Sequence, residues 1–312
     1  MATAPGAPTG VIAVAQGGSA QVSWTAPASN GGSAVTAYAV TTSPGGATCA
    51  TTGALTCVVG GMADGTYTFT AVASNAVGSG PASLPSSQVV IDTTPPPTPG
   101  VPVARLAAPS TLGTTVPVSL MWSASSVSDL DHYEVWRSIN GAPYVLLATP
   151  TSATWAHVFA TSSITWYRFR ITAVDTVGNV SAVADGASFH VRRIEQTAPS
   201  IRYAGTWSRV VATSASGGSY RTTNRAGASA TFTFTGRTVA LAAKRGPLMG
   251  AVRVYADGVL IATVSETAAT TQWRQIVLSR SWPASGKHTI RLVYAGLTGR
   301  RNANVDAFIV LD

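Results

Sequence analysis

The chain has 312 residues, of which 46% are hydrophobic and only 10% are charged. This length exceeds one β-sandwich and suits two or three domains of about 100 residues, while the recurring apolar residues exclude a disordered chain. The net charge of +8 belongs to residues 196–312, since 1–95 sum to −2 and 96–195 to zero, so an electrostatic partner is expected at the C-terminal part.

No apolar run approaches the roughly 18 residues that a membrane-spanning helix needs. Residues 1–8 have neither the basic start nor the apolar core of a signal peptide. We therefore expect either that a leader was removed or that the chain leaves the cell by another route, such as host-cell lysis.

The first predicted module contains two cysteines, Cys49 and Cys57, on what are expected to be adjacent strands of a short hairpin. The short closed loop and the lack of a nearby histidine favour a disulfide, and hence an oxidising compartment, over a metal site. A pair of buried free thiols is the alternative. The strands of this module are predicted at 11–14, 20–24, 35–41, 56–59, 66–73 and 88–91.

A proline-rich linker at 92–100 separates this module from a second one. Asn140-Gly141 is a strong hairpin signal between two strands of the second module. Its strands are predicted at 118–122, 132–137, 144–147, 166–174 and 188–192.

Both modules carry a strand that ends in tryptophan, Trp24 or Trp122, and a later strand with a tyrosine, Tyr67 or Tyr167. A turn with the pattern Val-Gly follows that later strand in each. These motifs, in this order, resemble the fibronectin type III family. The resemblance implies that each tryptophan packs in the core and that each tyrosine ties a corner of the sandwich.

The third module differs in type, and Asp257-Gly258 predicts a tight turn within it. Its strands are predicted at 229–235, 238–242, 251–255, 259–264, 273–278, 288–294 and 304–310. This number of strands suits a jelly roll. The segments 230–236, 246–258, 286–290 and 305–308 resemble galactose-binding-like modules, many of which bind carbohydrate. The predicted fold is therefore all-β, with three sandwiches at 1–94, 95–195 and 196–312.

The sequence lacks the Gly-x-Ser-x-Gly, His-Glu-x-x-His and P-loop motifs of common enzymes. We therefore expect no catalytic residue, no cofactor and no metal. The absence of acids between Glu195 and Asp257 disfavours a structural calcium site. Asp306 is expected to pair with an arginine or with backbone donors, and a contact with a ligand or cation is the alternative.

The loops of the third module combine aromatic rings with cations and amides. Sugar recognition needs a ring face against the C–H groups of the sugar and planar polar groups for its hydroxyls. The predicted ligand-binding residues are Tyr220, Arg221, Lys244, Arg245, Trp273, Arg274, Arg300 and Asn302. Solvated arginines beside core aromatics are one alternative, and an anionic ligand such as acidic polysaccharide, teichoic acid or a lipid headgroup is another.

The resulting hypothesis is a non-catalytic extracellular protein, secreted, on a cell surface or on a virion, that binds a polysaccharide or cell-wall glycan through its third module. Nucleic acid is disfavoured by the neutral or acidic first modules and the expected disulfide. One alternative is a phage-tail or surface-fibre protein that associates with itself. Another is the accessory C-terminal region of a secreted glycoside hydrolase.

Overall fold

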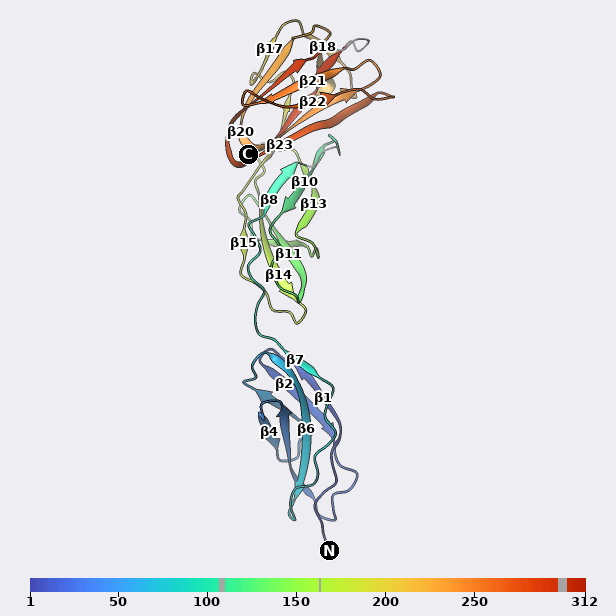
Figure 1. Cartoon of the computed structure of the whole chain (residues 1–312), viewed down its shortest axis with the longest axis vertical. Helices are drawn as coiled ribbons and strands as arrows, with labels where there is room; N and C mark the ends of the chain where they lie inside the picture. Colours follow the sequence, from blue (N-terminus) through green and yellow to red (C-terminus); the bar gives the residue numbers. More distant parts are fainter. Residues whose placement is uncertain (107–109, 163, 297–301) are drawn as a thin grey trace. The chain divides into compact units, whose positions relative to one another are not determined.

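The computed structural model describes residues 1–106, 110–162, 164–296 and 302–312. Almost every element is a β-strand, which confirms the all-β prediction (Figure 1). The chain forms two compact units, Met1–Pro95 with Thr176–Asn179, and Pro96–Asp175 with Val180–Asp312. Within the described residues, no helix is long and apolar enough to cross a membrane.

The first unit is a sandwich of two antiparallel sheets, with the strand orders β1-β2-β5 and β4-β3-β6-β7. Alternate residues of β6 are buried between the sheets, because side chains of a strand point to opposite faces in turn. The strands are Thr9–Ala15 (β1), Ser19–Thr25 (β2), Val35–Ser43 (β3), Thr48–Thr51 (β4), Thr56–Gly60 (β5), Gly65–Asn75 (β6) and Val89–Ile91 (β7).

The two residues expected from the fibronectin resemblance occupy their predicted places in the first unit. Trp24 is buried against Tyr38, with 5.5 Å between ring centroids. The hydroxyl of Tyr67 donates a hydrogen bond to the carbonyl of Ala63 at 3.0 Å. This bond fixes the chain that enters β6, so the predicted tyrosine corner is confirmed.

The predicted disulfide between Cys49 and Cys57 is confirmed, but its position differs from the expected hairpin. Cys49 lies on β4 and Cys57 on β5, which are edge strands of different sheets. The bond therefore joins the two layers of the sandwich. Sequence spacing alone did not reveal this, because the loop between the two strands crosses from one sheet to the other.

The second unit begins with another sandwich, whose sheets have the orders β13-β10-β8 and β12-β11-β14-β15. Asn140 and Gly141 both have positive φ, 52° and 80°, and turn the chain between β11 and β12 as predicted. Trp122 is buried and meets Tyr133 edge-on. The strands are Val103–Leu106 (β8), Thr115–Met121 (β10), Leu130–Ile139 (β11), Val145–Ala148 (β12), Thr154–Ala160 (β13), Tyr167–Asp175 (β14) and Ala184–Asp185 (β15).

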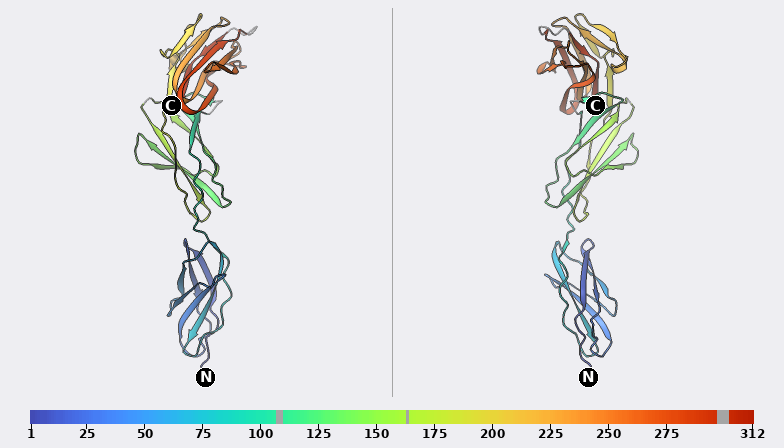
Figure 2. Two further views of the ribbon diagram at one scale, coloured as in Figure 1. Left: turned by 60° about the vertical axis from the view of Figure 1, so that its left-hand side comes forward. Right: turned by 90° about the vertical axis from the view of Figure 1, so that its right-hand side faces the viewer.

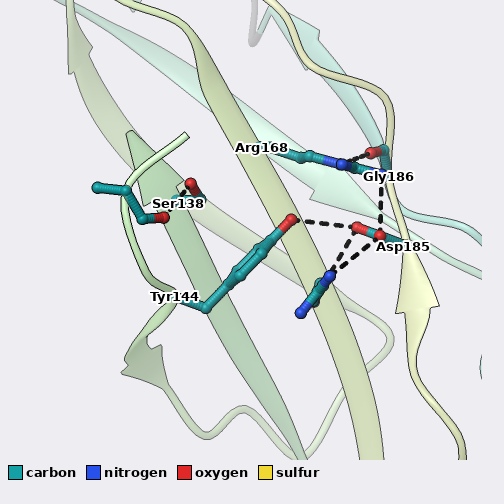
Figure 3. Close-up of polar contacts among 7 residues, drawn as sticks. Ser138, Tyr144, Arg168, Asp185 and Gly186 are labelled. Atoms are coloured by element: carbon teal, nitrogen blue, oxygen red, sulfur yellow. Dashed lines mark hydrogen bonds and ion pairs between the residues drawn. The ribbon is translucent and has the colours of Figure 1, made fainter. Parts of the chain in front are cut away.

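A polar cluster ties the outer strands of this sandwich together (Figure 3). The hydroxyl of Tyr144 donates to Asp185 Oδ1 at 3.2 Å, and Arg168 donates to Asp185 Oδ2 at 2.9 Å and to the carbonyl of Gly186 at 3.0 Å. The guanidinium of Arg170 stacks on the ring of Tyr144 at 3.8 Å. Because Asp185 pairs with both arginines and accepts from Tyr144, we assign the cluster to the stability of the sheet.

The rest of the second unit is the C-terminal module, built on an eight-stranded sheet and a sheet of order β18-β19-β24 (Figure 2). The large sheet has the order β16-β25-β20-β23-β21-β22, with β17 added beside β20 and β9 beside β23. Its strands are Ser110–Thr111 (β9), Val191–Glu195 (β16), Ile201–Ala204 (β17), Ser229–Arg245 (β20), Ala251–Ala256 (β21), Val259–Ser265 (β22), Gln272–Tyr294 (β23) and Ala307–Leu311 (β25). The small sheet has Ser208–Val211 (β18), Ser219–Thr223 (β19) and Ala303–Val305 (β24), and the 3-10 turn Ser216–Gly218 (η1) precedes β19.

Two pairs of strands that the sequence analysis separated are continuous. β20 covers the predicted strands 229–235 and 238–242, and β23 covers 273–278 and 288–294. The pairing of β20 with β23 shifts register between Gly236 and Thr238. A Cβ at position 236 would lie 2.7 Å from the carbonyl oxygen of Leu311, so the bend requires glycine. The galactose-binding-like identity of this module stays a prediction.

The second unit has a hydrophobic core that both of its sandwiches share. Leu112, before β10, is buried in the same cluster as Ile276 of β23 and Ile309 of β25. In addition, β9 pairs with β23, and β16 pairs with β25. The predicted domain boundary at residue 195 falls at the end of β16. This strand was assigned to the second module, but it pairs with β25 of the C-terminal sheet.

Candidate functional site

A groove of about 490 Å³ opens on the C-terminal module, and we call it the Lys244 groove. Strands β19 and β20 supply its polar floor, and the loop after β20 supplies an apolar wall. Among the described residues that line it, Lys244 is the one with a charge. The lining residues are Tyr220, Thr222, Lys244, Gly246, Pro247, Leu248, Met249, Thr271 and Asn302.

Lys244 lies against two aromatic rings. Its Nζ is 5.5 Å from the ring centroid of Tyr220 and 4.9 Å from that of Trp273. These rings meet edge-on, with 5.7 Å between centroids. A cation near ring faces is stabilised by their quadrupoles, so the ammonium group is held in a defined place.

Backbone irregularities next to Lys244 help to set its direction. The register of β20 against β23 shifts between Ala243 and Arg245, so that Lys244 falls in a bulge. On the facing strand, Arg274 adopts a positive φ of 54°. Bulges redirect side chains and are over-represented beside functional sites.

A buried polar pair holds the backbone of Lys244 from behind. The side-chain amide of Asn304 accepts a hydrogen bond from Lys244 N and donates one to Lys244 O, both at 2.8 Å. Glu266 in turn accepts hydrogen bonds from the backbone and side-chain amides of Asn304, at 3.0 and 2.8 Å. Sequence reasoning missed this pair, because only the fold brings residues 266 and 304 beneath Lys244.

The electrostatics behind the groove favour a positive site. Burial raises the pKa of the Glu266 carboxyl well above its usual range, and the two hydrogen bonds from Asn304 lower it only in part. A raised pKa favours the neutral acid. A neutral Glu266 does not offset the positive charge of Lys244, whereas an ionised Glu266 would.

The apolar wall of the groove is fixed by backbone contacts. Gly250 N donates to the carbonyl of Asn302 at 2.7 Å, and the hydroxyl of Thr267 donates to the carbonyl of Met249 at 2.9 Å. Leu248, directly before these anchored residues, is 60% exposed. The wall thus presents an apolar side chain on a restrained loop.

The structure brings four of the eight predicted ligand-binding residues together. Tyr220, Lys244 and Asn302 line the groove, and Trp273 contacts both Tyr220 and Lys244. Tyr220 is only 8% exposed, so little of its ring is accessible to a ligand. The binding role of these residues stays a prediction.

Three other predicted residues point elsewhere. The guanidinium of Arg221 packs on the ring of Tyr203 at 4.6 Å, and that of Arg245 donates to the carbonyl of Thr267 at 2.9 Å. Arg274 acts electrostatically on the buried Asp306. Their sequence neighbours Tyr220, Lys244 and Trp273 lie at the groove. Because adjacent residues of a strand point to opposite sides, the three arginines point away from it. The eighth residue, Arg300, lies outside the described residues.

Asp306 lies between β24 and β25, which belong to different sheets, and is fully buried. Its Oδ1 accepts a hydrogen bond from Ser216 N at 2.8 Å, which confirms the expected backbone donor. Burial and the nearby Glu195 raise the pKa of this carboxyl to about 7, against the opposing effects of that hydrogen bond, Arg274 and Arg193.

The arrangement in the groove suits hydrogen bonding to a small polar ligand. Lys244 and the amide of Asn302 supply donors, Thr271 adds a hydroxyl at the rim, and Leu248 supplies an apolar surface. Such a combination of a few convergent polar groups with apolar walls is typical of ligand sites.

Comparison with known proteins identifies the first module. Residues 6–89 match the model of the fibronectin type III domain. The resemblance predicted for this module is therefore confirmed. The match covers the first compact unit and does not extend to the C-terminal module.

Two characterised proteins are similar to part of the chain. Endoglucanase B of Cellulomonas fimi is 34% identical over 139 residues, which cover 42% of this chain and 12% of that protein. Chitinase A1 of Niallia circulans is 34% identical over 137 residues, which cover 43% of this chain and 18% of that protein. The chain thus spans less than a fifth of the length of either relative.

Among solved structures, the FN1–FN3 domains of chicken CNTN1 align with 58% of this chain and 66% of their own. The alignment has 17% sequence identity and a TM-score of 0.35.

Proposed function

We propose that the chain is an extracellular, non-catalytic protein that binds a polysaccharide or cell-wall glycan in the Lys244 groove. One observation carries the proposal: the ammonium of Lys244 is held against two rings and beside the amide of Asn302, on a backbone that Asn304 clamps. Preorganised donors next to an apolar wall can pair sugar hydroxyls at a low cost in conformational entropy.

The comparisons support a link with polysaccharides. The two relatives are named as an endoglucanase and a chitinase, and the first module is a fibronectin type III domain. The disulfide between Cys49 and Cys57 supports an oxidising compartment, as outside a cell. In this proposal the fibronectin-type modules are spacers.

A second candidate is that the chain is the accessory region of a longer polysaccharide-degrading enzyme. The small share of both relatives that it matches favours this candidate. Mass spectrometry of the native protein from its source distinguishes the two, because a longer polypeptide with hydrolase activity supports the accessory region.

Binding of the full chain to immobilised β-glucan, chitin and cell-wall polysaccharide tests the glycan proposal. Lys244→Ala and Asn302→Ala are expected to weaken retention about tenfold or more, the usual effect of losing a hydrogen bond to a ligand or to a charged group. Arg245→Ala is the matched control, since this neighbouring cation points to Thr267 and away from the groove.

Retention that is unchanged in Lys244→Ala and Asn302→Ala would contradict the groove assignment, as would equal loss in Arg245→Ala. If no polysaccharide retains the wild-type chain, the glycan function is wrong. Light scattering addresses the phage-tail or surface-fibre alternative, which predicts a defined oligomer in place of a monomer.

A further inference from the structure

A second surface of the C-terminal module is formed by the outward face of its large sheet, apart from the Lys244 groove. β17, β20, β23 and β21 pair side by side there, which places Arg202 opposite Thr231, Thr231 opposite Arg291, and Arg291 opposite Tyr255. The register also pairs Thr235 of β20 with Lys287 of β23, and Val293 of β23 with Arg253 of β21. We call Arg202, Arg253, Lys287 and Arg291 the cationic sheet face.

The alternation of the strands shows that these side chains point away from the core. Phe232, Ile290, Leu292 and Val254 belong to the hydrophobic cluster of the module. Their sequence neighbours point to the opposite face of the sheet. All four cations of that face are exposed, and threonines lie between them.

The four cations have no ion pair with any acid of the described residues. The ion pairs of those residues involve other cations. Asp257, at the end of β21, already accepts hydrogen bonds from His288 and from the backbone of Thr289. The positive charge of the face is therefore available to a partner.

The spacing of the charges allows their fields to add. Arg202 and Arg291 lie two strands apart, or about 10 Å. Arg253 is a diagonal neighbour of Arg291, at roughly 7–8 Å. These separations are comparable to the screening length of about 10 Å at 0.1 M salt, so the guanidinium groups reinforce one another.

We propose that the cationic sheet face binds a linear acidic polysaccharide. Guanidinium groups pair with carboxylates in a bidentate geometry. The hydroxyls of Thr231, Thr233 and Thr289 lie between the cations and match the hydroxyls of sugars, and Tyr255 adds a ring. Charge complementarity favours an anionic polymer, and the threonine hydroxyls beside the ring of Tyr255 favour a glycan.

The test measures binding of the full chain to immobilised polygalacturonate at rising salt, with a neutral glucan for comparison. The triple variant Arg202→Gln/Arg253→Gln/Arg291→Gln is expected to weaken binding to polygalacturonate about tenfold at low salt, since three exposed ionic contacts contribute modestly each. The affinity of the wild-type chain should fall as salt rises.

The matched control is Arg209→Gln/Arg225→Gln/Arg280→Gln, which removes the same charge from other exposed positions of the module. This control should retain most of the wild-type affinity. Circular dichroism and urea midpoints verify that both triple variants are folded. If the sheet variant proves unstable, the single variants Arg253→Gln and Arg291→Gln must each weaken binding by a smaller factor.

Equal weakening in the two triple variants would overturn the proposal, because the effect would then follow net charge and not this face. Absence of binding to polygalacturonate would also overturn it. Tighter binding of duplex DNA, or of vesicles that contain phosphatidylglycerol, would assign the face to a phosphate-bearing partner instead.

Discussion

Asp306 provides the sharpest test of the electrostatics inside the C-terminal module. Its pKa is raised from 3.8 to about 7 in the folded chain, chiefly by burial. An acid whose folded pKa exceeds its unfolded pKa destabilises the fold as pH rises between the two values. The interval corresponds to about 4 kcal/mol, at about 1.4 kcal/mol per pH unit. The wild-type chain should therefore lose stability between pH 4 and pH 7.

The substitution Asp306→Asn removes this titration and keeps an oxygen that can accept from Ser216 N. Urea unfolding of both proteins from pH 4 to pH 8 gives the difference in free energy of unfolding of the second unit. Relative to wild type, the free energy of unfolding of the variant should rise by about 4 kcal/mol between pH 4 and pH 8. Glu266 titrates in both proteins, so its contribution cancels.

Asp257→Asn is a control of opposite sign. Burial raises the pKa of Asp257, but hydrogen bonds from Thr289 and from the side chains of His288 and Trp282 outweigh this effect and lower it. Asp257 therefore contributes stability above its unfolded pKa that is lost as pH falls through its folded pKa. A difference between wild type and Asp306→Asn that is constant across pH would refute the reasoning for Asp306.

Three further predictions concern the packing of the two units. The double variant Cys49→Ala/Cys57→Ala should lower the free energy of unfolding of the first unit by about 2–3 kcal/mol in urea, from the short loop that the disulfide closes, and an unchanged midpoint would contradict this. Tyr67→Phe should cost about 1 kcal/mol in the same assay, because its hydrogen bond to Ala63 is lost, whereas a neutral effect would assign no stability to the corner. Leu112→Ala should lower the free energy of unfolding of the second unit by about 2–5 kcal/mol, and the unfolding midpoints of its two sandwiches should fall together. Separate unfolding transitions of the two sandwiches would show that the shared core does not couple them.

Several local features were predictable because their causes lie within a few residues. The resemblance to the fibronectin type III family implied that Trp24 and Trp122 pack in the cores of their modules, and both are buried. Asn140-Gly141 and Asp257-Gly258 predicted their turns, and both residues of each pair adopt the positive φ that such turns require.

The candidate site was predictable only in part. Tyr220, Lys244 and Asn302 line one groove, and Arg221 and Arg274 do not. Tyr220 and Lys244 lie on strands β19 and β20, whereas the sequence analysis expected them in loops. The composition of these segments indicated where cations lie along the chain, whereas the direction of each side chain depends on the register of its strand. A shift of one residue in register reverses that direction.

The sequence by itself determined the all-β class, the turns, the buried tryptophans and the concentration of positive charge in residues 196–312. These properties follow from alternation, turn chemistry, the motifs of the family resemblance and composition, each of which depends on a short segment or on residue counts. The tertiary structure alone decided that the disulfide joins two sheets, that Leu112 and Ile276 share a core, and that the bulge at Lys244 turns it toward Tyr220. Each of these depends on which distant strands pair and in which register, and that choice is made by the packing of the whole module.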